Sequence, residues 1–262
     1  MASAAMSPSA WPRGAGASSS TAAIGRAARL WLNASHSKGA RRAFLSRTSP
    51  RLPRFALSLT PCGAMATASM RSSTTPGSAP AGRGASADGF ELRFAVNYLA
   101  GFLLTRLLLP MLTSRNSARI VNVSSAGQQA IDFSDVMLTR GYSGVRAYCQ
   151  SKLAQILFTV DLAKELAGQN ITVNCLHPAT YMDTTMVRLS GVRPISTVEQ
   201  GGAAILQLVD EPALAGRSGL YFSGMQESRA DRQAYDEDAR RRLRALSFDL
   251  VGLPDPLAGP AN

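Results

Sequence analysis

The feature that most constrains the fold is an alternation of short β-branched runs and helical patterns after residue 88. The runs ARIVNVSS at 118–125 and ITVNCLHP at 171–178 are typical of buried strands. A helical pattern at 198–209 leads into a third apolar run, GLYFSG at 219–224. Strands that alternate with helices are joined by crossovers and form a parallel sheet. We therefore expect an α/β fold with a doubly wound parallel sheet.

Three further segments have the apolar spacing of helices: residues 91–114, Ala147–Leu166 and a last helix near Ala230–Leu246. The last one contains RRRLRAL, which we interpret as a basic, solvated face. The longest apolar run, Phe102–Leu112, is interrupted by an arginine and a proline and is too short to span a bilayer. It predicts a buried helix rather than a membrane span.

Charge is distributed unevenly along the chain. Of the 28 Lys and Arg residues, eleven lie in residues 1–86, which contain no Asp or Glu; the first acid is Asp88. The other seventeen bases balance all seventeen acids, so residues 87–262 are neutral. This part has no electrostatic signature for nucleic acid or a membrane surface, and a nucleic-acid binder is the least favoured interpretation.

The three cysteines indicate neither a disulfide framework nor a metal site. Cys62, Cys149 and Cys175 form no CxxC pair and no even set. His177 has no Cys, His or acidic partner at metal spacing, so we expect a structural histidine and no bound metal. A reducing compartment, and hence a cytoplasmic location, is the expectation.

The stretch AYCQSKLAQILF places a tyrosine and a lysine four residues apart on a predicted helix, at Tyr148 and Lys152. A free phenol titrates near 10, and an ammonium group one helical turn away favours the phenolate. Such a pair can serve as a general acid and base. Alone it is a weak signal, because Tyr and Lys at this spacing are also common surface neighbours.

Four stretches in register strengthen it: residues 86–110 (SADGFELRFAVNYLAGFLLTRLLLP), 119–127 (RIVNVSSAG), 148–152 (YCQSK) and 176–185 (LHPATYMDTT). Together they resemble the short-chain dehydrogenase/reductase family over residues 85–252, and within it the retinol-dehydrogenase-like and bacterial members. The resemblance implies a Rossmann-like sheet. It also implies an oxidoreductase that transfers hydride between NAD or NADP and an alcohol or carbonyl.

The resemblance assigns roles to individual residues. Tyr148 would be the general acid and base, and Lys152 would lower its pKa and hold the nicotinamide ribose. Ser125 would hydrogen-bond the substrate oxygen and stabilise charge that grows in the transition state. Ser124 is the competing candidate for that role. Asn97 would hold a water that links Lys152 to bulk solvent, and its structural alternative is a polar helix residue bonded to backbone.

The loop after the second strand departs from the family pattern. Ala179 stands where glycine is common, and an extra residue precedes Thr184. The resemblance implies that this loop binds the nicotinamide carboxamide, with Pro178, Ala179, Thr180 and Thr184 as candidate contacts.

The segment between Ala126 and Ala147 is longer than a simple turn. In retinol-dehydrogenase-like members such an insert borders the substrate pocket, which would imply an apolar alcohol or carbonyl. The same side chains could instead cover the edge of the sheet. The apolar residues concerned are Ile131, Phe133, Val136, Met137 and Leu138.

Residues 1–86 differ in composition from the rest of the chain and allow several interpretations. They are rich in Ser, Ala, Gly and Arg and show no sustained periodicity, as in a disordered linker or an organellar targeting peptide. A third interpretation comes from the genetic code: residues 67–77, read in a shifted frame, permit RLDALVNNAG, which resembles the NNAG strand end of the same family. We expect a basic, disordered or frame-shifted segment followed by the catalytic part at 87–262.

The cofactor half of the predicted fold is incomplete. No strand followed by a glycine turn and a helix is found, and GASSSTAAIGRA at 16–27 follows no strand. The residue that selects NAD or NADP is therefore not identifiable. The loss of this half would leave an unpaired, apolar sheet edge.

The resemblance implies a homodimer through helices 94–113 and 146–167. The alternative to an enzyme is a non-catalytic subunit that binds a partner through these helices. Cofactor binding separates the two, since only the enzyme needs it.

Overall fold

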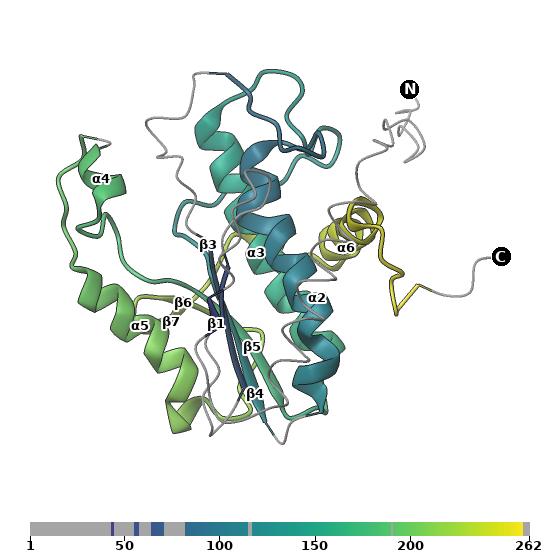
Figure 1. Ribbon diagram of the computed structural model, residues 1–262, viewed down its shortest axis with the longest axis vertical. Helices are drawn as coiled ribbons and strands as arrows, with labels where there is room; N and C mark the ends of the chain where they lie inside the picture. The colour runs from purple at the N-terminus through teal and green to yellow at the C-terminus, as the bar shows by residue number, and fades with distance from the viewer. Residues whose placement is uncertain are drawn as a thin grey trace.

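The computed structural model describes residues 82–114, 117–189 and 191–258, together with three strands at 43–44, 55–57 and 64–70 (Figure 1). Its centre is one seven-stranded sheet in the order β1-β2-β3-β4-β5-β6-β7. The strands are β1 Ala43–Phe44, β2 Phe55–Leu57, β3 Ala64–Met70, β4 Ala118–Val123, β5 Ile171–His177, β6 Tyr221–Ser223 and β7 Gln226–Ser228.

The four central strands, β3 to β6, are parallel, and antiparallel strands flank them on both sides. Val121 of β4 pairs with Thr67 on one side and Asn174 on the other. The burial pattern of β5, with six of seven residues buried, is typical of a strand covered on both faces. The predicted α/β, Rossmann-like parallel sheet is confirmed.

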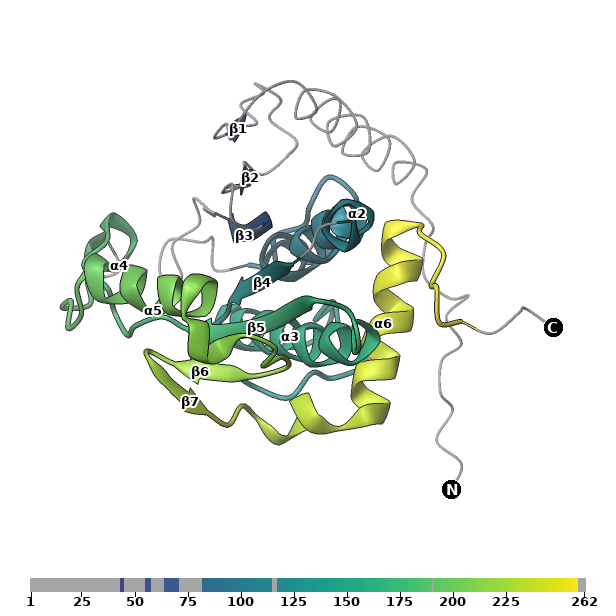
Figure 2. The ribbon, with the colours of Figure 1, turned by 90° about the horizontal axis from the view of Figure 1, so that it is seen from below.

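Helices cover both faces of this sheet (Figure 2). On one side lie η2 and α2, which form one continuous helix, with α3 beside them and α6 across their outer side; α5 lies on the other side. The helices are η2 Phe94–Leu99, α2 Ala100–Thr113, α3 Gly144–Glu165, α4 Thr185–Leu189, α5 Val198–Asp210, η3 Pro212–Leu214, η4 Arg232–Tyr235 and α6 Glu237–Val251.

Local sequence explains where several helices begin. Ser143 caps α3 by accepting a hydrogen bond from the amide of Arg146. Thr197 and Gln200 form a reciprocal capping box at the start of α5, so two otherwise unpaired amides are satisfied. Asp236 caps α6, and Gly252 ends it in the left-handed conformation that glycine adopts without strain.

The last helix differs from its prediction. It spans Glu237–Val251 rather than the region near Ala230–Leu246, because Asp236 is the capping residue and the preceding residues form the short η4 turn. Its basic face is only partly solvated. Arg240 and Arg244 are buried, whereas Arg241 and Arg242 are exposed.

One expectation about the N-terminal segment is wrong, while the assignment of residues 1–86 as a disordered, frame-shifted or targeting segment stays a prediction. The structure places β1, β2 and β3 in residues 1–86, although the sequence there shows no strand periodicity. It also gives β4 a parallel partner, β3, so the edge of β4 that we expected to be unpaired is covered. The candidate glycine turn at 16–27 lies outside the described residues.

The main core lies between the sheet and α2, α3 and α6, and it contains an aromatic cluster. The ring of Phe102 lies 5.1 Å from that of Phe158 and 5.1 Å from that of Phe248. The Arg106 guanidinium carbon lies 4.8 to 5.6 Å from the centroids of these three rings. Such cation–π contacts help to offset the cost of burying this charge.

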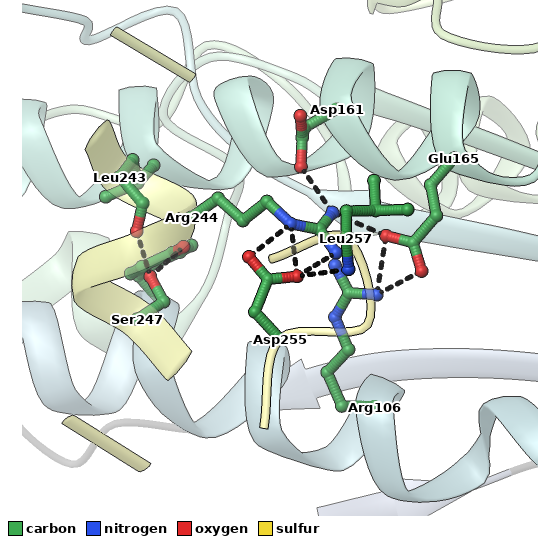
Figure 3. A network of polar contacts seen from close by, with 9 residues as sticks. Arg106, Asp161, Glu165, Leu243, Arg244, Ser247, Asp255 and Leu257 are labelled. Carbon is green, nitrogen blue, oxygen red and sulfur yellow. Dashed lines mark hydrogen bonds and ion pairs between the residues drawn. The ribbon is translucent and has the colours of Figure 1, made fainter. Parts of the chain in front are cut away.

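A buried ion network ties α6 to the helices beneath it (Figure 3). Arg244 pairs with Glu165 at 2.6 Å, Asp161 at 3.1 Å and Asp255 at 2.5 Å, and Arg106 pairs with Glu165 at 2.7 Å. Burial opposes ionisation of Asp255, but hydrogen bonds from Arg244 outweigh it, and the pKa of this carboxyl is held below its usual range. The network therefore fixes α6 on α2 and α3.

This position of α6 bears on the expected homodimer. A dimer through the outer faces of helices 94–113 and 146–167 would require the surface on which α6 lies (Figure 2). The aromatic and ionic contacts above already use that surface within one chain. The homodimer through these helices stays a prediction.

Candidate active site

The candidate site is built where the carboxyl end of β4 meets the first turns of α3. Gly127 marks the closest approach. A Cβ atom placed on it would lie 3.4 Å from Cε1 of Tyr148, 3.5 Å from Sγ of Cys149 and 3.6 Å from Oγ of Ser125. These are ordinary van der Waals distances, so the loop after β4 packs directly on α3 at this residue.

Ser125, and not Ser124, faces the tyrosine. The Ser125 hydroxyl accepts a hydrogen bond from the amide of Gly127 at 3.1 Å and interacts with the side chain of Tyr148. The Ser124 hydroxyl donates instead to the backbone carbonyl of Lys152 at 2.7 Å. The structure thus brings the predicted serine to the phenol and gives its competitor a structural role.

Two effects act in opposite directions on the pKa of Tyr148. Burial raises the pKa of the Tyr148 phenol, and its hydrogen bond with Ser125 opposes that rise without cancelling it. Lys152 is not among the causes of this shift, and its expected role in lowering the pKa stays a prediction. The ammonium lies 5.9 Å from the centroid of the Tyr148 ring and is engaged elsewhere.

Lys152 is held at the end of β4. Its Nζ donates to the carbonyl oxygen of Val123 at 3.1 Å and to Oε1 of Gln155 at 3.1 Å. Burial lowers its pKa to about 8, because a poorly solvated ammonium loses its proton more easily. Gln155 is a site residue that the sequence reasoning missed, although its position three residues after Lys152 on the same helix was an available signal.

Asn97 reaches the site indirectly. Its Nδ2 donates to Oγ of Ser151 at 2.9 Å, and the Ser151 hydroxyl donates to the backbone carbonyl of Tyr148 at 2.7 Å. These contacts connect η2 to the backbone that carries the tyrosine. The hydrogen bond of Asn97 is thus made to Ser151 and not to Lys152.

The loop after β5 closes on itself through its polar side chains. Nε2 of His177 and Oγ1 of Thr180 lie 2.8 Å apart, which agrees with the expected structural histidine. Burial lowers the pKa of His177. The Thr184 hydroxyl accepts from the amide of Val187 at 3.4 Å, while Pro178 is buried and Ala179 half-buried.

The apolar insert packs into the core. Ile131, Val136 and Met137 are buried in the main hydrophobic cluster, Phe133 lies against it, and Leu138 is also buried. Packing in the core accounts for their burial, so these side chains do not by themselves indicate an apolar substrate. Within the described residues, no group of three or more His, Cys, Asp or Glu side chains could hold a metal ion.

Comparison with known proteins gives consistent results. Residues 71–191 match the short chain dehydrogenase family. Retinol dehydrogenase 13 of Homo sapiens is 42% identical over 188 residues, which cover 64% of this chain and 56% of that protein. Retinol dehydrogenase 11 of Mus musculus is 39% identical over 179 residues, with the same coverage of 64% and 56%.

Among solved structures, an uncharacterized protein from Mycobacterium paratuberculosis is 30% identical, with a TM-score of 0.52. The match covers 67% of this chain and 64% of that one. The chain belongs to the short-chain dehydrogenase/reductase family, and the likeness extends over about two-thirds of its length. Within that family it is retinol-dehydrogenase-like, and it spans a little over half the length of the curated relatives it matches.

The expected cytoplasmic location is wrong. The chain is similar to retinol dehydrogenases 11 to 14, and this similarity does not support a simple cytoplasmic location. In addition, the helix Phe94–Thr113 is long and apolar enough to cross a membrane, and half of its most apolar window is buried in the fold. The run Phe102–Leu112 was judged too short because the turns of η2, Phe94–Leu99, were not counted with it.

Proposed function

We propose that the protein is a nicotinamide-dependent oxidoreductase that interconverts an alcohol and its carbonyl compound. The observation that carries the proposal is the convergence of Ser125 and Tyr148, with Lys152 one helical turn away, at the carboxyl end of β4. Family membership supports it. In parallel α/β sheets, ligands bind beyond the carboxyl ends of the strands, which is where these side chains lie.

The described residues suit the nicotinamide end of such a cofactor. Lys152 has three N–H donors, of which Val123 and Gln155 take two, so one can reach a ribose hydroxyl. The loop after β5 offers further candidate contacts: the backbone at Pro178, Ala179 and Thr180 and the hydroxyl of Thr184. The bound cofactor, NAD or NADP, would supply the hydride acceptor or donor.

Residues of the chain itself transfer the proton of the substrate hydroxyl. In alcohol oxidation the Tyr148 phenolate accepts the hydroxyl proton, and in reduction the phenol returns a proton to the forming alkoxide. Ser125 donates a hydrogen bond to the same substrate oxygen and stabilises its growing negative charge. Because burial holds the Tyr148 pKa high, an ammonium that approaches the phenol would favour the phenolate.

Asn97 and Ser151 position the base in this proposal. Their hydrogen bonds fix the carbonyl of Tyr148 against η2, so the phenol is presented from a helix held at two points. A site whose side chains are supported in this way loses less entropy on reaching the reactive geometry.

The substrate class follows from the relatives. Their names, retinol dehydrogenases 11 and 13, indicate an apolar primary alcohol of the retinoid type, and we extend this class to the present chain. The proposal does not depend on the insert residues, which are packed in the core.

The proposal is tested with Tyr148→Phe, which removes only the phenolic oxygen. Retinol oxidation with NAD or NADP, followed by the absorbance of the reduced cofactor, should fall about 10²- to 10⁴-fold because the general base is lost. Tyr235→Phe is the matched control, since Tyr235 lies in η4 and is exposed. Equal activity of Tyr148→Phe and the wild type would contradict the proposal.

A further inference from the structure

We infer that Gln155 is a positioning residue for Lys152: its side-chain carbonyl, together with the Val123 backbone carbonyl, holds the ammonium at the carboxyl end of β4. This inference rests on the proposed function, because it assigns a support to the lysine of the proposed site. The geometry that carries it is the pair of 3.1 Å hydrogen bonds from Nζ. One acceptor comes from the strand and the other from the next turn of the same helix.

The backbone beneath both side chains is fixed to the same strand. The hydroxyl of Ser124, which directly follows β4, donates to the carbonyl of Lys152 at 2.7 Å. One turn later, the Thr159 hydroxyl donates to the carbonyl of Gln155 at 2.8 Å and accepts from Nδ2 of Asn122, also of β4, at 2.8 Å. The two residues are therefore presented by a helix segment bound to β4 at two consecutive turns.

The surroundings of the ammonium are neutral. From β4 it meets the Val123 carbonyl, with Ser124 and Ser125 alongside; on α3 it meets the amide of Gln155 and lies near the phenol of Tyr148. Burial is the cause of its lowered pKa, with no charged neighbour contributing. Under these conditions a hydrogen bond to a neutral carbonyl is the main means by which the protein keeps this lysine protonated.

The sign of the effect follows from the acceptor. A carbonyl oxygen stabilises the charged ammonium, so removal of the Gln155 amide should lower the Lys152 pKa further. A hydrogen bond to a charged group is worth about 1.5–3 kcal/mol, so we expect Gln155→Leu to lower it by about one pH unit. Gln155→Glu should raise it by about one unit or more, because the acceptor then carries a negative charge.

The chain is well suited to a direct measurement, because it contains only three lysines, at positions 38, 152 and 164. Acylation by an N-hydroxysuccinimide ester requires the neutral amine, so its rate against pH reports the pKa. Peptide mass spectrometry separates Lys152 from Lys164, whose side chain is 60% exposed and serves as an internal reference. For the wild type, the midpoint at Lys152 should lie near 8.

Two Gln155 variants test whether the side-chain amide helps to keep Lys152 protonated. Gln155→Leu should shift the Lys152 midpoint down and Gln155→Glu should shift it up, with Lys164 unchanged in both. Gln169→Leu is the matched control, because Gln169 is exposed and its one described hydrogen bond is made by its backbone amide. Should Gln155→Leu fold poorly, Gln155→Asn, which retracts the carbonyl by one methylene, should give a smaller downward shift.

Identical Lys152 midpoints in the wild type, Gln155→Leu and Gln155→Glu would overturn the inference. The measurement needs no cofactor and no turnover. If the midpoints shift as expected but the wild type oxidises no alcohol, the proposed function fails and the positioning role stands. If the wild type is active and the midpoints do not move, the positioning role alone fails.

Discussion

The two faces of the sheet are built differently. The face under α2, α3 and α6 holds most of the buried residues, including the aromatic cluster and the ion network of Arg106 and Arg244. The face under α5 holds a cluster of six buried residues: Val121, Leu176, Ala204, Leu208, Leu214 and Phe222. Near α5, the side chains of Tyr181, Leu189, Ile195 and Val198 are at least half exposed.

This difference separates the two parts of the candidate site. Tyr148 and Lys152 stand on α3, inside the deeply packed face, where neighbouring elements fix them. The loop that carries Thr180 and Thr184 leads toward α5, and backbone hydrogen bonds from Asp183 to Ser196 and from Ile195 to Tyr181 join it to the segment before that helix. We conclude that the chemical groups lie on the well-packed face and the candidate cofactor loop on the lightly packed one.

The largest effect should come from removing the centre of the ion network. Arg244→Met leaves Glu165, Asp161 and Asp255 without their shared cation, so the free energy of unfolding should fall by about 3–5 kcal/mol. Urea unfolding measures this loss.

The matched control for Arg244→Met is Arg241→Met, on the same helix. Arg241 pairs with Asp238 on the exposed surface, and exposed pairs contribute about 0–1 kcal/mol. Equal losses in the two variants would show that the network adds nothing specific to the packed face.

A leucine on each face compares the two cores directly. Leu157 of α3 and Leu208 of α5 are both almost fully buried, and truncation to alanine costs about 2–5 kcal/mol, depending on how far the site can collapse. We expect Leu157→Ala to lie at the upper end of this range and Leu208→Ala at the lower end, since α5 has fewer neighbours. Unfolding experiments that rank the two in the opposite order would contradict the comparison.

The smallest effect concerns the contact between α5 and the loop. A Cβ atom on Gly201 would collide with Sδ of Met182, so Gly201→Ala should destabilise the protein by about 1 kcal/mol. Adding Met182→Ala should remove that penalty in a double-mutant cycle. Gly202→Ala, where the added Cβ meets no atom within 4 Å, should instead stabilise α5 slightly. A Gly201 penalty that persists without Met182 would locate the strain elsewhere.

Much of the fold could be predicted, because the spacing of apolar residues along the chain indicates which side chains are buried. The two β-branched runs became β4 and β5, and the apolar run at 219–224 became β6. The helical pattern at 198–209 became α5 with one residue added. The last helix was misplaced because a capping aspartate, Asp236, determines its start more strongly than the apolar pattern does.

The site was partly predictable for the same reason. Tyr148, Lys152 and Ser125 lie in local motifs, and a motif can be read from sequence. The orientation of the Lys152 side chain could not be predicted from sequence. Whether its ammonium points to the phenol or to Val123 and Gln155 depends on packing between α3 and β4. Strands β1 to β3 were missed because their segment carries no alternation of apolar and polar residues.

The division of the chain at residue 86 stays a prediction. We propose that residues 67–77 encode the NNAG strand end of the family in a shifted frame. Sequencing the transcript through codons 1–90 should then reveal a strand, glycine turn and helix in another frame. An open frame that encodes only the present residues would contradict this proposal.

The most direct test of the central claim is a calorimetric titration of the full chain with NADPH and with NADH. We expect saturable binding of at least one of them, weakened in Lys152→Met because the ribose loses its ammonium donor. Absence of binding by both would contradict it and would favour a non-catalytic subunit.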